Sequence, residues 1–283
     1  MRIVFVLGFV FALMLQASSS VWKVSKGTHT LYIGGTFHIL RPSDYPLPHE
    51  YETAFNQADT LAFETDLKAM QDPMFSMKMM GALMQTQGKT LHDDLDKKTY
   101  MTLKKYVAKQ NLPMSMLDSM RPQMVVITLM MAELQRLGLN TQGVDAYYNA
   151  KAIREQKQLQ FFETPEEQLS FLSHMGEGQE NEMILQTIED MNQMQTLLDQ
   201  MITSWRTGNL KTMEALALDS MKKDYPELFE MLVVKRNDAW MPKIETMLMD
   251  DKVGFVLVGT LHLVGKEGVL ERLEAKGYKV TQL

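Results

Sequence analysis

The sequence predicts an α/β protein whose central sheet is built from both chain ends and whose middle forms a large helical insertion. β-prone segments occur near residue 30 and at residues 253–258, where the apolar run is uninterrupted. Such runs are typical of strands that are covered on both faces. Between about residues 66 and 249, apolar side chains recur every three or four residues, which indicates helices. No change of composition marks a linker, so we expect one domain over residues 21–283.

The N-terminal part is expected to contain a hairpin, a loop, a helix and a buried strand, in that order. Trp22-Lys23-Val24 and Leu31-Tyr32-Ile33 are the predicted hairpin strands. Three prolines make residues 41–48 a loop, because proline fits neither a helix interior nor a sheet ladder. Residues 50–57 are predicted to be helical, and residues 60–63 form a short strand that ends at Glu64.

The remaining elements follow the spacing of the apolar residues. We expect a strand at 157–162, a helix near 269–276 and a last strand at 278–282. Further helices are predicted at residues 70–84, 115–137, 165–174, 181–205, 210–221 and 225–248. The 26 methionines largely follow the apolar helix faces, which favours core packing over a greasy binding groove. Residues 77–80 are the stretch most expected to depart from that pattern.

Composition excludes several kinds of protein and site. The chain has 283 residues, a net charge of -6 and no cysteine. Nucleic acid is not an expected partner, because a surface that follows phosphates needs an excess of Lys and Arg. Without cysteine there can be neither a disulfide nor a thiolate zinc site, so any metal must be held by His, Asp and Glu.

Residues 1–20 have the pattern of a cleaved signal peptide. Arg2 precedes an apolar run over residues 3–15, and small residues follow up to Ser20. The run is too short to span a bilayer comfortably, so we expect cleavage between Ser18 and Val21 and no membrane span afterwards. The mature protein is therefore predicted to be periplasmic or secreted.

A short motif occurs twice, each time after an apolar strand. Gly35-Thr36-Phe37-His38 is repeated as Gly259-Thr260-Leu261-His262. Because both strands carry the same motif, we predict that they are neighbours in the sheet. Ligands bind at the ends of strands in open sheets with covered faces, and Glu64 also ends a strand, so we expect it to lie with both histidines at that rim. Two histidines and a carboxylate suit a divalent cation, with Mn, Co or Zn favoured by nitrogen and oxygen ligands. Alternatively, Glu64 is a base that activates water while the histidines polarise the substrate, or the histidines have a purely structural role.

These motifs belong to an ordered series of short segments that resembles the TraB/GumN family, which is related to the Tiki proteases. The series also includes Ala58-Asp59, Phe63-Glu64-Thr65-Asp66, Gly143-Val144-Asp145, Phe162-Glu163-Thr164-Pro165-Glu166-Glu167-Gln168 and Lys235-Arg236-Asn237. It covers essentially the whole mature chain. The second motif of the family often has alanine where this sequence has Thr260.

The resemblance implies a metal-dependent, peptidase-like site made by His38, His262 and Glu64. More loosely, it implies polar roles for five further residues. Arg236 is expected to stabilise a developing oxyanion, although it could instead pair with a helix carboxylate such as Glu230. Substrate-binding roles are expected for Arg121, Asp145, Glu163 and Asn237.

Two functions are compatible with this pattern. The first is an exported metal-dependent hydrolase that cleaves a peptide or a similar small amide, with metal-bound water as the nucleophile. The second is a non-catalytic protein that sequesters a peptide or haem in the same cleft. A metal assay followed by incubation with mixed peptides distinguishes them.

Overall fold

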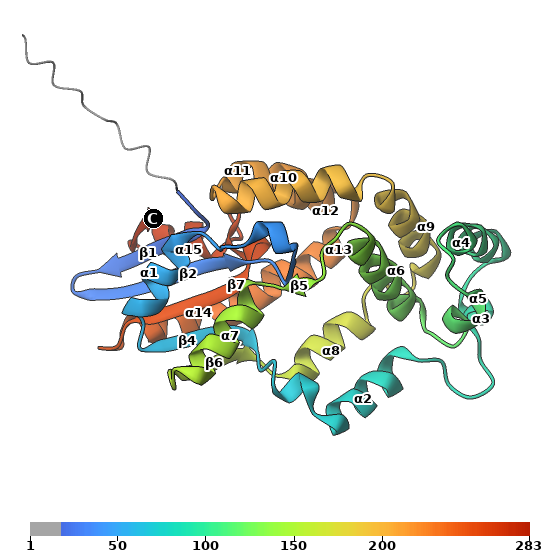
Figure 1. Cartoon of the computed structure of the whole chain (residues 1–283), viewed down its shortest axis with the longest axis horizontal. Helices are drawn as coiled ribbons and strands as arrows, with labels where there is room; N and C mark the ends of the chain where they lie inside the picture. The colour runs from blue at the N-terminus through green and yellow to red at the C-terminus, as the bar shows by residue number, and fades with distance from the viewer. Residues whose placement is uncertain (1–17) are drawn as a thin grey trace, which may run out of the picture.

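The central feature of the fold is a six-stranded sheet, seen in a computed structural model that describes residues 18–283 (Figure 1). The first 17 residues of the predicted signal peptide lie outside the described part. The strand order is β6-β4-β7-β2-β1-β8. The strands are β1 (Val21–Lys26), β2 (His29–Thr36), β4 (Thr60–Thr65), β6 (Gln158–Glu163), β7 (Gly254–Gly259) and β8 (Lys279–Gln282). The predicted α/β class and the origin of the sheet in both chain ends are therefore confirmed.

The four strands β6, β4, β7 and β2 are parallel, whereas β1 runs antiparallel to both β2 and β8. The neighbouring positions of β2 and β7 confirm the prediction drawn from the repeated motif. Their register is shifted by one residue relative to that motif, because Thr36 lies opposite Gly259 rather than opposite Thr260. All four parallel strands present their carboxyl ends at one edge of the sheet.

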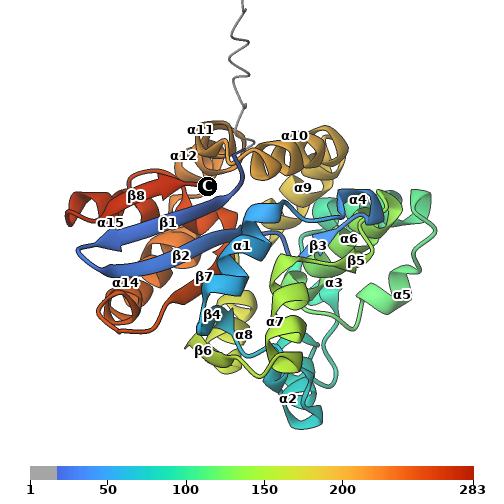
Figure 2. The same ribbon diagram turned by 60° about the vertical axis from the view of Figure 1, so that its left-hand side comes forward.

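Helices cover both faces of the sheet, as the uninterrupted apolar strands require (Figure 2). Phe255 and Leu257 pack with α1 (His49–Gln57), α7 (Val144–Arg154) and α10 (Met194–Arg206). The alternate residues Val256 and Val258 pack with α14 (Lys235–Leu248) and α15 (Val269–Ala275) on the opposite face. Strand β7 is thus buried on both sides.

The helical insertion has its own hydrophobic core beside the sheet (Figure 1). This core joins α3 (Leu91–Asp94), α4 (Lys97–Lys109), α5 (Met114–Leu117), α6 (Pro122–Arg136) and α9 (Glu180–Met191). The single helix predicted at 115–137 is wrong, because the chain breaks before Pro122. The helix predicted at 181–205 is likewise two helices, α9 and α10, separated at Asn192 and Gln193.

The stretch around residues 77–80 does depart from core packing. In helix α2 (Pro73–Leu83), the exposed fractions of Met74, Met77 and Met80 are 67%, 67% and 52%. Within residues 18–283, no helix has both the length and the apolarity that crossing a bilayer requires.

Candidate active site

A cavity of about 260 Å³ opens at the carboxyl ends of the parallel strands. Strands β2, β4 and β7 and the segments that follow them supply most of its lining. The lining residues are Thr36, His38, Phe63, Glu64, Thr65, Leu67, Met70, Asp145, Gln168 and Leu257. Ligands bind at this edge in open α/β sheets, so the cavity lies where the strand-end motifs predicted a site.

His38 and Asp145 form a hydrogen-bonded pair at this cavity, with 3.0 Å between His38 Nδ1 and Asp145 Oδ2. A two-stranded ladder brings them together, because β3 (Ile39–Leu40) pairs with β5 (Thr141–Gln142) just before α7 begins. Gly143 makes the approach possible, since a Cβ there would lie 2.0 Å from the carbonyl oxygen of Phe37. Asp145, in the first turn of α7, is thereby held against His38.

Asp145 changes the acidity of His38. Desolvation lowers the pKa of the imidazole, but the hydrogen bond to Asp145 and the negative charges of Asp145 and Glu64 outweigh it and raise the pKa to about 9. The side chain of His38 is still 64% exposed, so solvent weakens these interactions. With Nδ1 bonded to Asp145, Nε2 is the nitrogen free to exchange a proton with a substrate.

Arg236 uses all five of its N–H groups within the protein. Two bonds, of 2.7 and 2.8 Å, go to the oxygens of Glu163, and one of 2.6 Å goes to Glu64 Oε2. The remaining two go to His262 Nε2 at 3.0 Å and the Leu232 carbonyl at 3.5 Å. Arg236 therefore pairs with two sheet carboxylates rather than with Glu230, and it has no free donor for an oxyanion.

Glu64 is held as a carboxylate by its surroundings. Burial alone would raise its pKa, but Arg236 and the backbone amide of Gly259 outweigh burial and lower the pKa to about 2. Oε1 accepts the Gly259 amide at 2.6 Å, and Oε2 accepts Arg236 and, at 3.4 Å, the amide nitrogen of Gln168. A carboxylate this weakly basic is a poor proton acceptor at neutral pH.

The hydrogen-bond network assigns the tautomer of His262. Asn237 donates its amide hydrogens to the carbonyls of His262 (3.1 Å) and Glu267 (2.7 Å), so its oxygen accepts from His262 Nδ1 at 2.8 Å. Nε2 consequently carries the lone pair and accepts from Arg236. Burial and the nearby Arg236 charge lower the pKa of His262 to about 3, so the ring is neutral at physiological pH.

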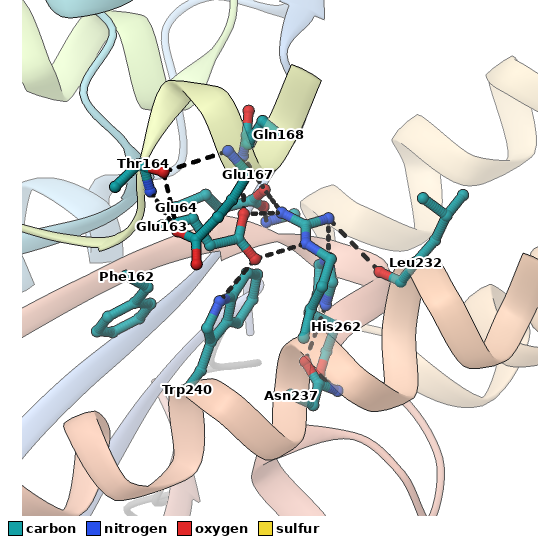
Figure 3. Close-up of polar contacts among 12 residues, drawn as sticks. Glu64, Phe162, Glu163, Thr164, Glu167, Gln168, Leu232, Asn237, Trp240 and His262 are labelled. Carbon is teal, nitrogen blue, oxygen red and sulfur yellow. Dashed lines mark hydrogen bonds and ion pairs between the residues drawn. The ribbon is translucent and has the colours of Figure 1, made fainter. Parts of the chain in front are cut away.

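Two side chains that complete this network were not among the predicted site residues, although Gln168 lies in one of the family-like segments. Trp240 donates its indole N–H to Glu163 Oε1 at 2.9 Å. Its ring packs against the imidazole of His262, with 4.3 Å between the ring centroids (Figure 3). Gln168 lines the cavity and donates to Glu163 Oε2 at 3.1 Å. Trp240 lies one helical turn after Arg236, so the spacing of the two residues could have indicated that Trp240 belongs to the site.

Helix α14 follows a π-helical turn at Glu230–Val234, a feature frequent at functional sites.

The structure thus separates the predicted site residues into three groups. His38, Asp145 and Glu64 line the cavity. A buried network behind Glu64 contains Glu163, Arg236, Asn237 and His262. Arg121 belongs to neither group, because it begins α6 and donates to the carbonyl of Ala82 at 2.9 Å.

A divalent cation held jointly by His38, Glu64 and His262 does not fit this arrangement. The lone pair of His262 faces the Arg236 guanidinium, and both Glu64 oxygens already accept hydrogen bonds. In the described part of the chain, no three His, Cys, Asp or Glu side chains are placed to hold a metal ion. Binding of Mn, Co or Zn stays a prediction, which metal analysis of the purified protein tests.

The parallel strands and the cavity at their carboxyl ends define an α/β protein with a cavity at the strand ends. The chain matches the TraB/PrgY/gumN family over residues 20–282. It therefore belongs to this family, as the ordered motifs indicated. Searches among curated proteins and among solved structures find no match.

Proposed function

We propose that the protein is an exported hydrolase that cleaves a peptide bond or a similar amide in the cavity beside His38. The observation that carries this proposal is the His38–Asp145 pair at the cavity, since a carboxylate-bound imidazole is a common device for moving protons in amide hydrolysis. The TraB/GumN family is related to the Tiki proteases, and this relation supports the reaction class but not a particular substrate. The predicted signal peptide supports an extracytoplasmic location.

In the proposed reaction, neutral His38 takes a proton from an attacking water at Nε2 and then delivers it to the leaving nitrogen. Asp145 orients the ring through Nδ1 and stabilises the imidazolium that forms in between. Glu64 stays ionised and adds to this stabilisation, whereas Arg236 and His262 fix the position of Glu64. The raised pKa of His38 implies that kcat/KM rises with pH towards about 9.

The test is hydrolysis of a defined mixture of synthetic peptides, read by mass spectrometry for wild type and for His38→Ala. Removing a general base typically costs ~10²–10⁴-fold in rate, so we expect a loss of that size. His49→Ala is the matched control, because His49 is 83% exposed and lies away from the cavity lining. In Asp145→Asn, the pH profile should shift downward together with the pKa of His38.

Metal removal distinguishes the remaining alternatives. If chelation leaves activity unchanged, proton transfer by His38 is sufficient. If activity is lost and returns with Mn, Co or Zn, the predicted cation is required and the mechanism above is wrong. If peptides or haem bind without any turnover, the protein is the sequestering alternative.

A further inference from the structure

The cavity contains polar atoms that the protein itself does not satisfy. Among residues 18–283, Thr36 Oγ1, Thr65 Oγ1 and Asp145 Oδ1 are buried without a hydrogen-bond partner, and all three residues line the cavity. Thr36 and Thr65 are only 4% and 3% exposed. A buried polar group without a partner costs free energy and needs an explanation. Three such polar atoms on residues that line one cavity indicate a ligand that supplies the missing hydrogen-bond partners.

The two hydroxyl groups come from the strands on either side of β7. Thr36 ends β2 and Thr65 ends β4, and β7, which lies between these strands, adds Leu257 to the lining. Each hydroxyl can donate one hydrogen bond and accept others, whereas Asp145 Oδ1 only accepts. Rotation of a threonine about χ1 exchanges its hydroxyl and methyl groups, which are similar in size, so either hydroxyl can turn to a ligand.

Apart from these polar groups, the walls are mainly apolar. Phe63, Leu67, Met70 and Leu257 supply this surface. A cavity of 260 Å³ exceeds the ~150 Å³ that holds benzene and falls below the ~300 Å³ at which drug-sized pockets begin. It therefore has room for one amino-acid residue. These walls disfavour a charged side chain, because burying an ion against apolar surface without a partner costs free energy.

We propose that the cavity binds one uncharged apolar residue of a peptide and that Thr36 and Thr65 hydrogen-bond to the amide of that residue. The apolar walls take its side chain, and Asp145 Oδ1 accepts an N–H group. This inference rests on the proposed amide hydrolase and names the substrate class of the same site. It assigns Thr36 and Thr65 as substrate-binding residues.

The experiment measures binding without requiring turnover. Saturation-transfer NMR titrations compare N-acetyl-leucinamide with the α-amide of N-acetyl-aspartic acid on the full mature chain. The leucine compound should bind, and the aspartate compound should bind at least about tenfold more weakly, because its carboxylate would lose hydration against the apolar walls. Thr36→Val and Thr65→Val should each weaken binding of the leucine compound by about two- to tenfold, as expected for one lost hydrogen bond.

A control and a second readout separate binding from folding. Thr60→Val changes a buried threonine at the opposite end of β4 and should leave the affinity unchanged. The melting temperatures of Thr36→Val and Thr65→Val should equal or exceed that of wild type, because each change removes an unsatisfied hydroxyl.

The outcomes also separate this inference from the proposed function. The inference is overturned if wild type binds neither compound, binds both equally, or binds the leucine compound equally well in both cavity variants. Peptide cleavage that survives such a result leaves the hydrolase proposal intact. Binding as expected without cleavage of any peptide instead supports the cavity assignment and contradicts the hydrolase.

Discussion

The two histidines of the repeated motif have opposite properties. His38 is 64% exposed, bonded to a carboxylate, and has a pKa raised to about 9. His262 is 6% exposed, bonded to a guanidinium, and has a pKa lowered to about 3. The motif places each imidazole just after a strand, but the neighbouring charges decide whether it can carry a proton. His262 is therefore a positioning residue for Arg236 rather than a second proton carrier.

His262→Gln tests this assignment through the pH dependence of stability. At pH 7 the variant should be less stable by about 1–3 kcal/mol, because it loses the bond between the ring and Asn237. Below a pH of about 6.5 the unfolded wild type takes up a proton at this histidine, whereas the folded protein does so only near its lowered pKa of about 3. The wild-type advantage should therefore shrink by about 1.4 kcal/mol per pH unit in this window. Urea unfolding at pH 7, 6 and 5 measures it.

His49→Gln is the control for the loss of any histidine, since that side chain is 83% exposed. Its difference from wild type should stay small at each pH. A wild-type advantage over His262→Gln that is constant from pH 7 to 5 would show that His262 is not held neutral by the fold.

The contact between strands β2 and β7 positions the site. Thr260 begins a short 3-10 helix, Thr260–Leu263, and donates from Oγ1 to the carbonyl of Thr36 at 3.1 Å. Its side chain lies against Gly35, where a Cβ would be 2.8 Å from Oγ1 and 3.0 Å from Cγ2. Glycine in the first motif is thus required by the threonine of the second motif, and the pair determines how closely the two strand ends approach.

Gly35→Ala should destabilise the protein by about 1–3 kcal/mol, because the added methyl overlaps Thr260 in a packed region. Thr260→Ala alone should cost about 1 kcal/mol for the lost hydrogen bond. In the double variant the overlap is gone, so the combined loss should be smaller than the sum of the two. A double-mutant cycle by urea unfolding gives this coupling.

Gly81→Ala provides the matched control, because no atom lies within 4 Å of the added Cβ in helix α2. It should be neutral or stabilising by up to about 1 kcal/mol. Strict additivity of Gly35→Ala and Thr260→Ala would contradict the proposed contact between the two motifs.

In the whole molecule, the start of the described chain pairs with the C-terminal strand. Strand β8 pairs with β1, and the Ser19 amide donates to the carbonyl of Leu283 at 3.2 Å. Ser20 is fully buried, with its hydroxyl donating to Trp205 at 2.7 Å and its carbonyl accepting from Gly35 at 2.8 Å. Ser19 and Ser20, the last two residues of the predicted signal peptide, thus contact the folded core and the strand that carries the first motif.

These contacts narrow the range in which we expect the signal peptide to be cleaved. The mature chain should keep Ser19 and Ser20, so N-terminal sequencing of protein from the periplasm or medium should begin at Ser18 or Ser19. A start after Ser20 would contradict the structural part of this prediction, because the bonds to Trp205 and Gly35 would be lost. An intact Met1 on a cytoplasmic product would contradict export altogether.

Local patterns in the sequence determined the class of fold, the neighbouring positions of β2 and β7, and the strand ends that carry His38, Glu64 and His262. These features follow from apolar periodicity and strand-end motifs, which depend on residues close together in the chain. The partners of those side chains were not predictable in the same way. Asp145 reaches His38 through the β3–β5 ladder, and Arg236 reaches Glu64 from a helix 172 residues later in the chain. Burial and charge at such long-range contacts decide which group can bind a substrate or exchange a proton, and only the tertiary structure brings those contacts together.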